Sequence, residues 1–546
     1  MRVLLVRPPI RVRSLEYPAG PRFGVPVGLL YLASTLESEG VEVAIYDALV
    51  DFSWEDVGPD DRGQYHIGAS WPTIAQHIRD YRPDVVGITN PYSDIADYTV
   101  RTAAEVKGID PGIVTVVGGP HPTSYPQGFL GAGGPVDYVV RGEGELTLAR
   151  LVRSVAAGSA VDEIPGISYV RGGQVRSNPP AAFVENLDDL PLPAYHLVPM
   201  ERYFELVGAG YPSRYTFEYR GSEREVSIVT SRGCPFRCVY CGNHLHMGRR
   251  WRANSVPYVL RHVELLVSRY GVRHLHVEDD NIGLKTERFE ALLGGIRAKG
   301  WDITWDTSNG IRFEGLGRDL LRKIKDSGCT YLEFGIDAGN QRVLDTVVKK
   351  NLKLSDVVEA VSFCKSIRLD VHGLYVVGFP GETGAEIRDT FEFARMLLRR
   401  FDVVPHLCLA RPLPGTELDE ICRAGGYLTE PVLPDIGGDY RTEIYPRVMI
   451  KTEAFSPREL EAWVRTFNGQ VIRILAVKIL LWLARHPAAL VAVARRLVRE
   501  APKGLPRALR HVAFGGLIFK FNLLDARLRR KFAAGSGAGG PEERAR

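Results

Sequence analysis

Three cysteines crowd into one short stretch of this chain. Cys234, Cys238 and Cys241 follow the apolar run at residues 226–229. Such a run predicts a strand, so the cysteines are expected on a tight loop at its end. Thiolates separated by three and then by two residues can all face one centre, as the ligands of an iron–sulfur cluster must. The stretch therefore suits a metal centre on a loop at the end of a strand.

The same spacing is compatible with two alternatives. A structural zinc ion takes four tetrahedral ligands, and His244 or His246 would have to complete such a set. The cysteines could also be small buried residues without a metal. The aromatic residue Tyr240, directly before the last cysteine, favours the cluster.

The stretch resembles the signature of the radical S-adenosylmethionine (SAM) superfamily, Cys-x3-Cys-x-aromatic-Cys. Cys234, Cys238, Tyr240 and Cys241 match it position by position. The resemblance implies that the three cysteines hold a 4Fe-4S cluster whose fourth iron is left open to chelate SAM. It also implies contacts to SAM from the motif aromatic and from residues that follow later strands, namely Tyr240, Glu278, Asp279, Glu333, Gly335, Asp337 and Gly378. Helix caps and solvated turns are the alternative for the residues after these strands.

The other cysteines do not form a disulfide framework. The chain has seven cysteines in 546 residues, an odd number, and none of them precedes Cys234. This usage favours a reducing cytoplasm. The N-terminus lacks the apolar stretch and cleavage site of a signal peptide, so no export is expected.

The first 145 residues predict a doubly wound α/β domain. Short β-branched runs near residues 3–6, 41–46, 85–89, 114–117 and 138–140 are typical of strands buried on both faces. A helical segment at 27–36 separates the first two runs, and glycine-rich loops follow the fourth and the fifth. In such sheets ligands bind beyond the carboxyl ends of the strands. No G-x-G-x-x-G fingerprint opens the first helix, which argues against a nicotinamide or flavin site.

This region resembles the cobalamin-binding domain that precedes some radical SAM domains. The resemblance is carried by the Pro8-Pro9 loop and the stretches at residues 27–32, 118–121 and 141–145. The D-x-H-x-x-G motif of other cobalamin proteins is absent, so the resemblance implies base-off cobalamin without a lower histidine ligand. The residues in which it implies cobalamin contacts are Pro8, Gly118, Gly119, His121, Gly142 and Glu143.

A second alternation begins at residue 223 and predicts a partial (β/α)6 barrel that extends to 430. Its expected strands lie near 226–230, 275–280, 303–307, 331–336, 371–377 and 404–409. The predicted site residues fall at the carboxyl ends of these strands, where barrel enzymes carry their sites. Residues 146–222, which contain a proline-stiffened stretch, are expected to be a connector.

The C-terminal region, residues 431–546, is expected to be mainly helical and is strongly basic. From Arg473 onward the only acidic residues are Glu500, Asp525, Glu542 and Glu543, although the whole chain has a net charge of only +4. Helices are predicted at 456–500 and 508–531, followed by a disordered tail from 533. Basic residues interrupt the apolar run near 470–498, so no transmembrane segment is predicted. Peripheral contact with an anionic membrane is an alternative to packing on the barrel, whereas a nucleic-acid partner is not expected.

Together the resemblances imply a cobalamin-dependent radical SAM methyltransferase. In that family a 5'-deoxyadenosyl radical abstracts hydrogen from the substrate, and the carbon radical takes a methyl group from methylcobalamin, which a second SAM regenerates. The expected substrate is a small metabolite, a natural-product intermediate or a lipid. The expected electron donor is a flavodoxin or a ferredoxin. A cyclase, oxidase or rearrangement enzyme without net methylation is one alternative, and a non-catalytic cobalamin or redox sensor is another.

Overall fold

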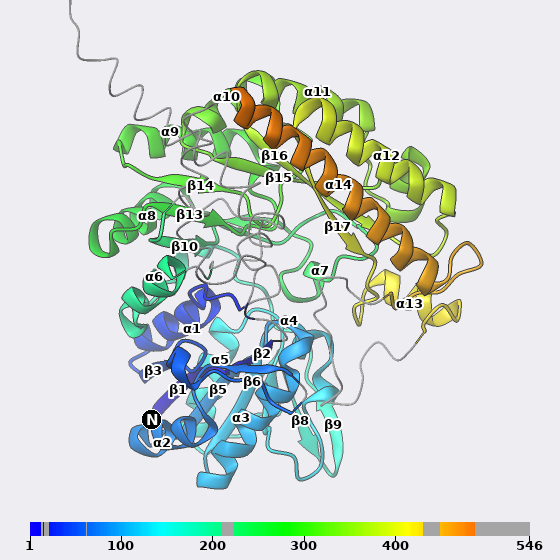
Figure 1. Cartoon of the computed structure of the whole chain (residues 1–546). Helices are drawn as coiled ribbons and strands as arrows, with labels where there is room; N and C mark the ends of the chain where they lie inside the picture. The colour runs from blue at the N-terminus through cyan, green and yellow to red at the C-terminus, as the bar shows by residue number, and fades with distance from the viewer. Residues whose placement is uncertain are drawn as a thin grey trace, which may run out of the picture. The chain divides into compact units, whose positions relative to one another are not determined.

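The computed structural model describes residues 1–12, 15, 21–61, 63–209, 211, 222–429 and 448–485. The chain divides into two compact units, one of Met1–Arg214 with Gly221–Glu461 and one of Tyr215–Arg220 with Ala462–Arg546. The first unit holds two successive α/β domains (Figure 1). The described part of the second unit, residues 462–485, belongs to one long helix.

The first domain contains the predicted parallel sheet. Its strands run in the order β3-β1-β5-β6-β7. This is the doubly wound order in which the winding direction changes beside the first strand, and ligands bind at the carboxyl edge near that change. Residues 3–6 of β1 are completely buried, which explains their unbroken apolar run. The strands are β1 (Arg2–Arg7), β3 (Glu42–Asp47), β5 (Val85–Thr89), β6 (Val114–Gly118) and β7 (Tyr138–Val140).

Helices cover both faces of this sheet (Figure 1). Helix α2 begins at the cap Ser70, whose side chain accepts a hydrogen bond from Thr73 N–H, and ends at Arg82 in a left-handed conformation. The helices of this region are α1 (Val27–Ser38), α2 (Trp71–Tyr81), α3 (Ala96–Ile109), α4 (Pro120–Ser124), α5 (Glu145–Ala156) and α6 (Met200–Gly208). A small antiparallel pair, β2 (Ile10–Val12) with β4 (Tyr65–Ile67), lies outside the main sheet.

The sheet continues beyond the predicted boundary at residue 145. Strands β8 (Ile167–Arg171) and β9 (Gln174–Ser177) form an antiparallel hairpin that pairs with β7. These residues were expected in the connector, but they belong to the sheet of the first domain. Gly172 and Gly173 both have positive φ, as a two-residue hairpin turn requires. The Gly-Gly pair between two β-branched stretches was therefore a usable sequence signal.

The second domain is the predicted six-stranded partial barrel. Two parallel sheets, β10-β13-β14 and β15-β16-β17, make up its wall. Backbone bonds join the two halves, because Trp305 N–H donates to the Gly328 carbonyl and Thr330 N–H donates to the Trp305 carbonyl. The strands are β10 (Glu225–Ile228), β13 (His274–Val277), β14 (Thr304–Asp306), β15 (Tyr331–Asp337), β16 (Asp370–Val377) and β17 (Val404–Leu409), each within a few residues of its prediction.

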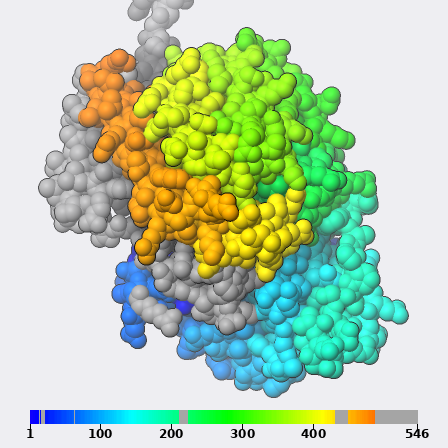
Figure 2. All heavy atoms as spheres, turned by 90° about the vertical axis from the view of Figure 1, so that its right-hand side faces the viewer, coloured from blue at the N-terminus to red at the C-terminus, as the bar shows by residue number. Residues whose placement is uncertain are grey.

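Helices cover the outside of the barrel, and α12 and α13 contribute the yellow-green and yellow surface in Figure 2. Helix α12 begins with a capping box between Thr383 and Glu386. The helices are α7 (Asn243–His246), α8 (Val256–Tyr270), α9 (Thr286–Lys299), α10 (Arg318–Asp326), α11 (Leu354–Ser366), α12 (Gly384–Phe401) and α13 (Glu417–Ala424), with a π-helical turn at Val343–Val348.

Helix α14 (Pro457–Arg485) confirms the described part of the helix predicted at 456–500. By length and composition alone it is apolar enough to cross a membrane, despite Arg473 and Lys478. The expectation of no transmembrane segment therefore stays a prediction. Residues 486–500, the second predicted helix at 508–531 and the tail from 533 lie outside the described residues.

Candidate active site

The cysteine loop turns sharply where β10 gives way to the short strand β11 (Ser231–Arg232), which pairs with β12 (Arg252–Ala253). Gly233 has φ +82°, and a Cβ there would collide with the Arg250 carbonyl oxygen. Only glycine suits this position. Gly233 N–H also donates to Asp280 Oδ2 at 2.6 Å. These constraints hold Cys234 at the carboxyl edge shared by β10 and β13.

The three thiols are not among the side-chain groups of the described residues whose ligand atoms all lie close enough to hold a single ion. In the described part of the chain, two groups of side chains offer three ligand atoms within 4.8 Å of one another, and neither contains a cysteine. A tetrahedral zinc ion with Zn–S bonds of about 2.3 Å would bring its thiolates within about 4 Å of one another. The structure therefore does not favour the zinc alternative. His244, a candidate fourth zinc ligand, has its Nδ1 at 3.0 Å from the carbonyl oxygen of Cys241.

The electrostatics of the loop also suit a metal. Burial raises the pKa of all three thiols, and that of Cys241 rises to about 11. Arg312 and Lys350 oppose the shift at Cys234 and Cys238, because nearby positive charge favours thiolates. Binding of iron would have to displace the thiol protons, as metal binding by cysteine generally does. The half-buried thiols and the adjacent cations fit a 4Fe-4S cluster.

Tyr240, the aromatic residue of the motif, is anchored to β15. Its hydroxyl donates to Asp337 Oδ1 at 2.8 Å, and Lys350 Nζ lies 2.6 Å from Asp337 Oδ2. Asp337 is buried at a bulge of β15 with φ +64°, a region that few residues other than glycine adopt. A Cβ at Gly335 would approach Lys350 Nζ to 2.8 Å. Asp337 and Gly335 thus position the cysteine loop, and their direct contact with SAM stays a prediction.

The two acidic residues directly after β13, Glu278 and Asp279, differ in their surroundings. Glu278 is half-buried at the strand end, and its contact with SAM stays a prediction. Asp279 is completely enclosed: Oδ1 accepts from Thr230 N–H at 2.6 Å, and Oδ2 accepts from the hydroxyls of Thr230 and Ser231 at 2.7 and 2.5 Å. Asp279 ties the end of β10 to β13 through these bonds, and its contact with SAM stays a prediction.

Glu333 lies inside the barrel and contacts a histidine that the sequence motifs did not identify. Its Oε1 is 2.6 Å from Nδ1 of His406 on β17, and both residues are buried. His372 on β16 lies close to the same pair. The contact of Glu333 with SAM remains a prediction. The two histidines stand singly in largely apolar strands. Single residues of this kind do not form a motif that can be recognised from the sequence.

The loop after β16 folds over the motif aromatic. Gly378 has φ +91°, and its N–H and that of Phe379 both donate to Glu382 Oε2 at 2.7 Å. The ring of Phe379 lies 5.8 Å from that of Tyr240, centroid to centroid. Gly378, a predicted SAM contact, is therefore on the same edge of the barrel as the cysteine loop.

Replacing Glu382 with glutamine is expected to remove a pH-dependent loss of stability. Burial raises the pKa of Glu382 from 4.5 to about 7, although bonds from the two N–H groups oppose the shift. Between these values the folded chain binds more protons than the unfolded chain, so stability falls as the pH rises and then levels off above about 7. The loss at neutral pH is roughly 3 kcal/mol. Glutamine still accepts both bonds and carries no charge.

Thermal unfolding midpoints of both proteins, measured at about pH 5.5 and about pH 8, check this expectation. Glu386→Gln is the comparison: its bond with Arg342 lowers the pKa of Glu386 to about 2, so its contribution to stability varies with pH only in more acidic solution, and E386Q should keep the pH dependence of the unaltered protein. An unchanged pH dependence in E382Q would contradict the assignment.

The predicted cobalamin loops lie together at the carboxyl edge of the first sheet. Pro8 is buried directly after β1. Gly119 has φ +124°, and a Cβ there would lie 2.5 Å from the Asn90 carbonyl oxygen, so glycine lets the loops after β5 and β6 approach. His121 Nδ1 is 2.9 Å from Ser93 Oγ, and burial lowers the pKa of His121 to about 4. Gly118 ends β6, and Gly142 N–H donates to Thr123 Oγ1 at 3.0 Å.

Glu143, a predicted cobalamin contact, is held in buried ion pairs. Arg252 Nη1 lies 2.8 and 2.9 Å from its two oxygens, and Arg232 Nη1 lies 3.2 Å from Oε1. Val184 N–H donates to Oε2 at 2.7 Å. All three charged side chains are buried, so Glu143 is an ion-pair residue, and its contact with cobalamin stays a prediction. Glu143 links the loop after β7 to Arg232, which stands two residues before Cys234.

A second contact supports this link. Arg232 Nη2 lies 2.7 Å from Glu145 Oε1, again between buried groups. Helix α4, which follows β6, also packs against α7, which follows Cys241. The loops predicted to hold cobalamin therefore adjoin the loop predicted to hold the cluster. Sequence reasoning missed the arginines, because partners about a hundred positions apart leave no local pattern.

Comparisons with known proteins agree with the assignment of both the first domain and the barrel. The B12 binding domain family matches residues 21–152, and the Radical SAM superfamily matches residues 228–394. "Uncharacterized methyltransferase PH0819" from Pyrococcus horikoshii is 34% identical over 78% of this chain and 84% of its own length. "Cytidylyl-2-hydroxyethylphosphonate methyltransferase" from Streptomyces wedmorensis is 29% identical over 78% of this chain and 82% of its own length.

Among solved structures, the cobalamin-dependent S-adenosylmethionine radical enzyme OxsB with aqua-cobalamin and S-adenosylmethionine bound matches with a TM-score of 0.66. That match covers 99% of this chain and 82% of OxsB at 16% identity, and it supports the fold. The cysteine motif, the order of the two domains and the 34% identical relative lead to one conclusion. The chain belongs to the radical SAM superfamily, among the members that carry a B12-binding domain before the radical SAM domain.

Proposed function

We propose that this enzyme is a cobalamin-dependent radical SAM methyltransferase that methylates a carbon atom of a small molecule. The observation that carries the proposal is the junction between the cysteine loop and the loops of the first sheet, held by Glu143, Glu145, Arg232 and Arg252. It brings the binding sites expected for the cluster and for cobalamin to one place. The two relatives named above, both methyltransferases by name, support the same activity.

The residues of the chain hold and orient the cofactors. Cys234, Cys238 and Cys241 are the proposed cluster ligands, and Tyr240 fixes their loop through Asp337. When bound, the cluster with SAM supplies hydrogen-atom abstraction and cobalamin supplies a methyl group. The residues proposed to lie along SAM are Tyr240, Glu278, Glu333, Gly335, Asp337 and Gly378, and those along cobalamin are Pro8, Gly118, Gly119, His121 and Gly142.

The junction is also suited to exclude water. Arg232, Arg252 and Glu143 are each less than a tenth exposed, although all three carry full charges. Charged groups at this depth are stable only when they are paired, so the first domain and the barrel are held closely together here. A closed junction protects reactive intermediates from solvent.

An anaerobic incubation of the cluster-loaded protein with cobalamin, SAM and a reductant tests the function. We expect both 5'-deoxyadenosine and S-adenosylhomocysteine by mass spectrometry, with the second product dependent on cobalamin. Protein without cobalamin is the matched control. Deoxyadenosine alone would contradict methyl transfer and favour a cyclase, oxidase or rearrangement enzyme. Neither product from protein with an intact cluster would favour a sensor.

We further propose a cytoplasmic location and a flavodoxin or ferredoxin as the electron donor. The absence of cysteines before Cys234 and the redox chemistry of the cluster support these assignments. Peripheral membrane contact through the basic C-terminal region is proposed from the apolar and basic composition of α14, which contains Arg473, Lys478 and Arg485.

A further inference from the structure

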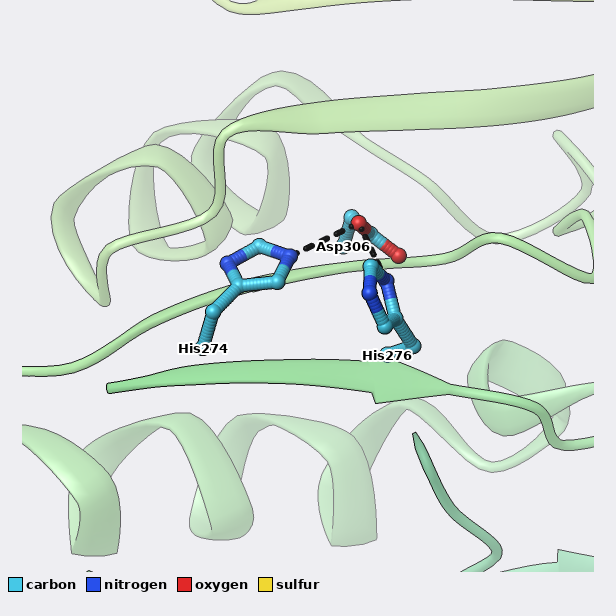
Figure 3. A group of neighbouring side chains, drawn as sticks. All are labelled: His274, His276 and Asp306. Atoms are coloured by element: carbon cyan, nitrogen blue, oxygen red, sulfur yellow. Dashed lines mark hydrogen bonds and ion pairs between the residues drawn. The ribbon is translucent and has the colours of Figure 1, made fainter. Parts of the chain in front are cut away.

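A compact group of metal-binding side chains lies inside the barrel, apart from the cysteine loop. His274 and His276 project from the same face of β13, and Asp306 projects toward them from the neighbouring strand β14 (Figure 3). Their ligand atoms all lie within 4.8 Å of one another. All three side chains are almost completely buried, at 0 to 4% exposure. Sequence motifs gave no indication of this group.

The contacts converge on a single atom. Asp306 Oδ2 lies 2.9 Å from His274 Nε2 and 2.8 Å from His276 Nδ1. The other carboxylate oxygen, Oδ1, accepts from Ser308 N–H at 3.0 Å. One nitrogen from each of the two rings and one oxygen from the carboxylate therefore lie within 4.8 Å of one another, on two paired strands.

The second nitrogen of each imidazole faces a polar side chain on the far side of its ring. His274 Nδ1 is 2.7 Å from Thr304 Oγ1, whereas His276 Nε2 is 3.6 Å from Glu225 Oε2 on β10, which is an ion-pair separation and too long for a hydrogen bond. Histidines that bind metals usually use their second nitrogen in this way, since the outer contact fixes which nitrogen faces the ion. Glu225 is itself buried, at 3% exposure.

The charges of the buried side chains also favour a bound cation. Asp306 and Glu225 place two carboxylates in the interior, where they need a compensating charge, either a proton on a neighbouring imidazole or a bound cation. A divalent cation among the three ligands would balance both. Two imidazoles and one carboxylate form a nitrogen–oxygen ligand set that suits first-row divalent ions, zinc among them.

We propose that His274, His276 and Asp306 bind a divalent transition-metal ion inside the barrel, separate from the iron–sulfur cluster, with Glu225 orienting His276. Tetrahedral bonds of about 2.1 Å place ligand atoms about 3.4 Å apart. The contacts of Asp306 Oδ2 with the two histidine nitrogens, at 2.9 and 2.8 Å, would therefore have to lengthen by about half an ångström. The ion would tie β13 to β14 beneath the proposed SAM site, and its role would be structural. The competing hypothesis is a metal-free hydrogen-bonded network of the same residues.

Zinc serves as the probe, because the cluster already supplies iron and cobalamin supplies cobalt. The cluster-loaded protein is equilibrated with Zn²⁺, freed of loosely bound metal and analysed by mass spectrometry of the elements. We expect about one zinc per chain for the unaltered protein, and at least a tenfold loss of zinc affinity in His276→Gln and Asp306→Asn. Glu225→Gln, which changes only the outer contact, is expected to weaken affinity about tenfold.

His262→Gln is the matched control, because His262 is equally buried but bonds to Tyr195 in a different part of the domain. Its zinc content should equal that of the unaltered protein. The visible absorbance of the cluster reports whether each variant is folded. Zinc X-ray absorption of the unaltered protein gives a readout that needs no variant, and the proposal predicts nitrogen and oxygen neighbours only.

Three outcomes would overturn the proposal. They are sulfur neighbours around zinc, an unaltered protein that retains no zinc, and equal zinc contents in folded H276Q, D306N and the His262→Gln control. The last two would favour the metal-free network, and the first would place the zinc on the cysteines. The test does not depend on methyl transfer, so failure of the proposed function leaves its outcome unaffected.

Discussion

Replacement of Cys241 by alanine is expected to abolish the visible absorbance of the cluster and all cleavage of SAM. The cluster needs all three thiolates, because a 4Fe-4S centre bound through two cysteines loses the geometry that leaves one iron open. Cys241 follows Tyr240, whose bond to Asp337 fixes the loop, so no neighbouring thiol can take its place. The same result is expected for Cys234→Ala and Cys238→Ala.

Absorbance spectra after anaerobic reconstitution, together with assays for 5'-deoxyadenosine, check this expectation. Cys422→Ala is the matched control: it makes the same change at a buried cysteine of α13, outside the loop, and should retain both signals. Retained SAM cleavage in any of the three loop variants would contradict the assignment of the cluster ligands.

The second large effect is expected from Glu143→Ala. This change leaves Arg232 and Arg252 buried without their shared carboxylate, and removal of one partner from a buried ion pair costs roughly 3–5 kcal/mol. Since Arg232 stands two residues before Cys234, the variant should also take up the cluster less completely. Denaturant unfolding measures the first effect, and iron content after reconstitution measures the second.

Glu185→Ala provides the comparison for Glu143→Ala. Glu185 also pairs with an arginine, Arg250, but both side chains are about 70% exposed. Exposed pairs of this kind contribute little to stability. If the two alanine variants were equally stable, the buried ion pairs would not hold the junction together.

The sequence predicted those parts of the fold whose signals are local. Each barrel strand is a short apolar run followed by a helical segment, and the doubly wound sheet shows the same alternation, so both architectures were recognisable. The cysteine motif was equally local, because its three ligands and its aromatic residue occupy eight consecutive positions from Cys234 to Cys241. The hairpin of β8 and β9 was missed although its Gly172-Gly173 turn marked it.

The parts that were not predicted depend on contacts between distant segments. Glu143 was assigned by motif to a ligand loop, but its partners Arg232 and Arg252 lie 89 and 109 positions away. Asp279 follows a strand at a position typical of ligand contacts, yet the hydroxyls of Thr230 and Ser231 enclose it. His274 and His276 alternate along a strand, and only the neighbouring strand reveals their common partner, Asp306.

The ion pairs of Glu143 bear on how this enzyme can be rebuilt from parts. A chimera that joins the barrel to the first domain of another protein would keep Arg232 and Arg252, and it would be stable only if the donor domain carried a carboxylate at the position of Glu143. The same holds for the barrel expressed alone, which would expose two clustered cations beside the cysteine loop. The edge of the first sheet that carries Glu143 and Glu145 therefore has to be transferred together with the cysteine loop. A cut in the chain between residues 145 and 222 does not separate two independent modules.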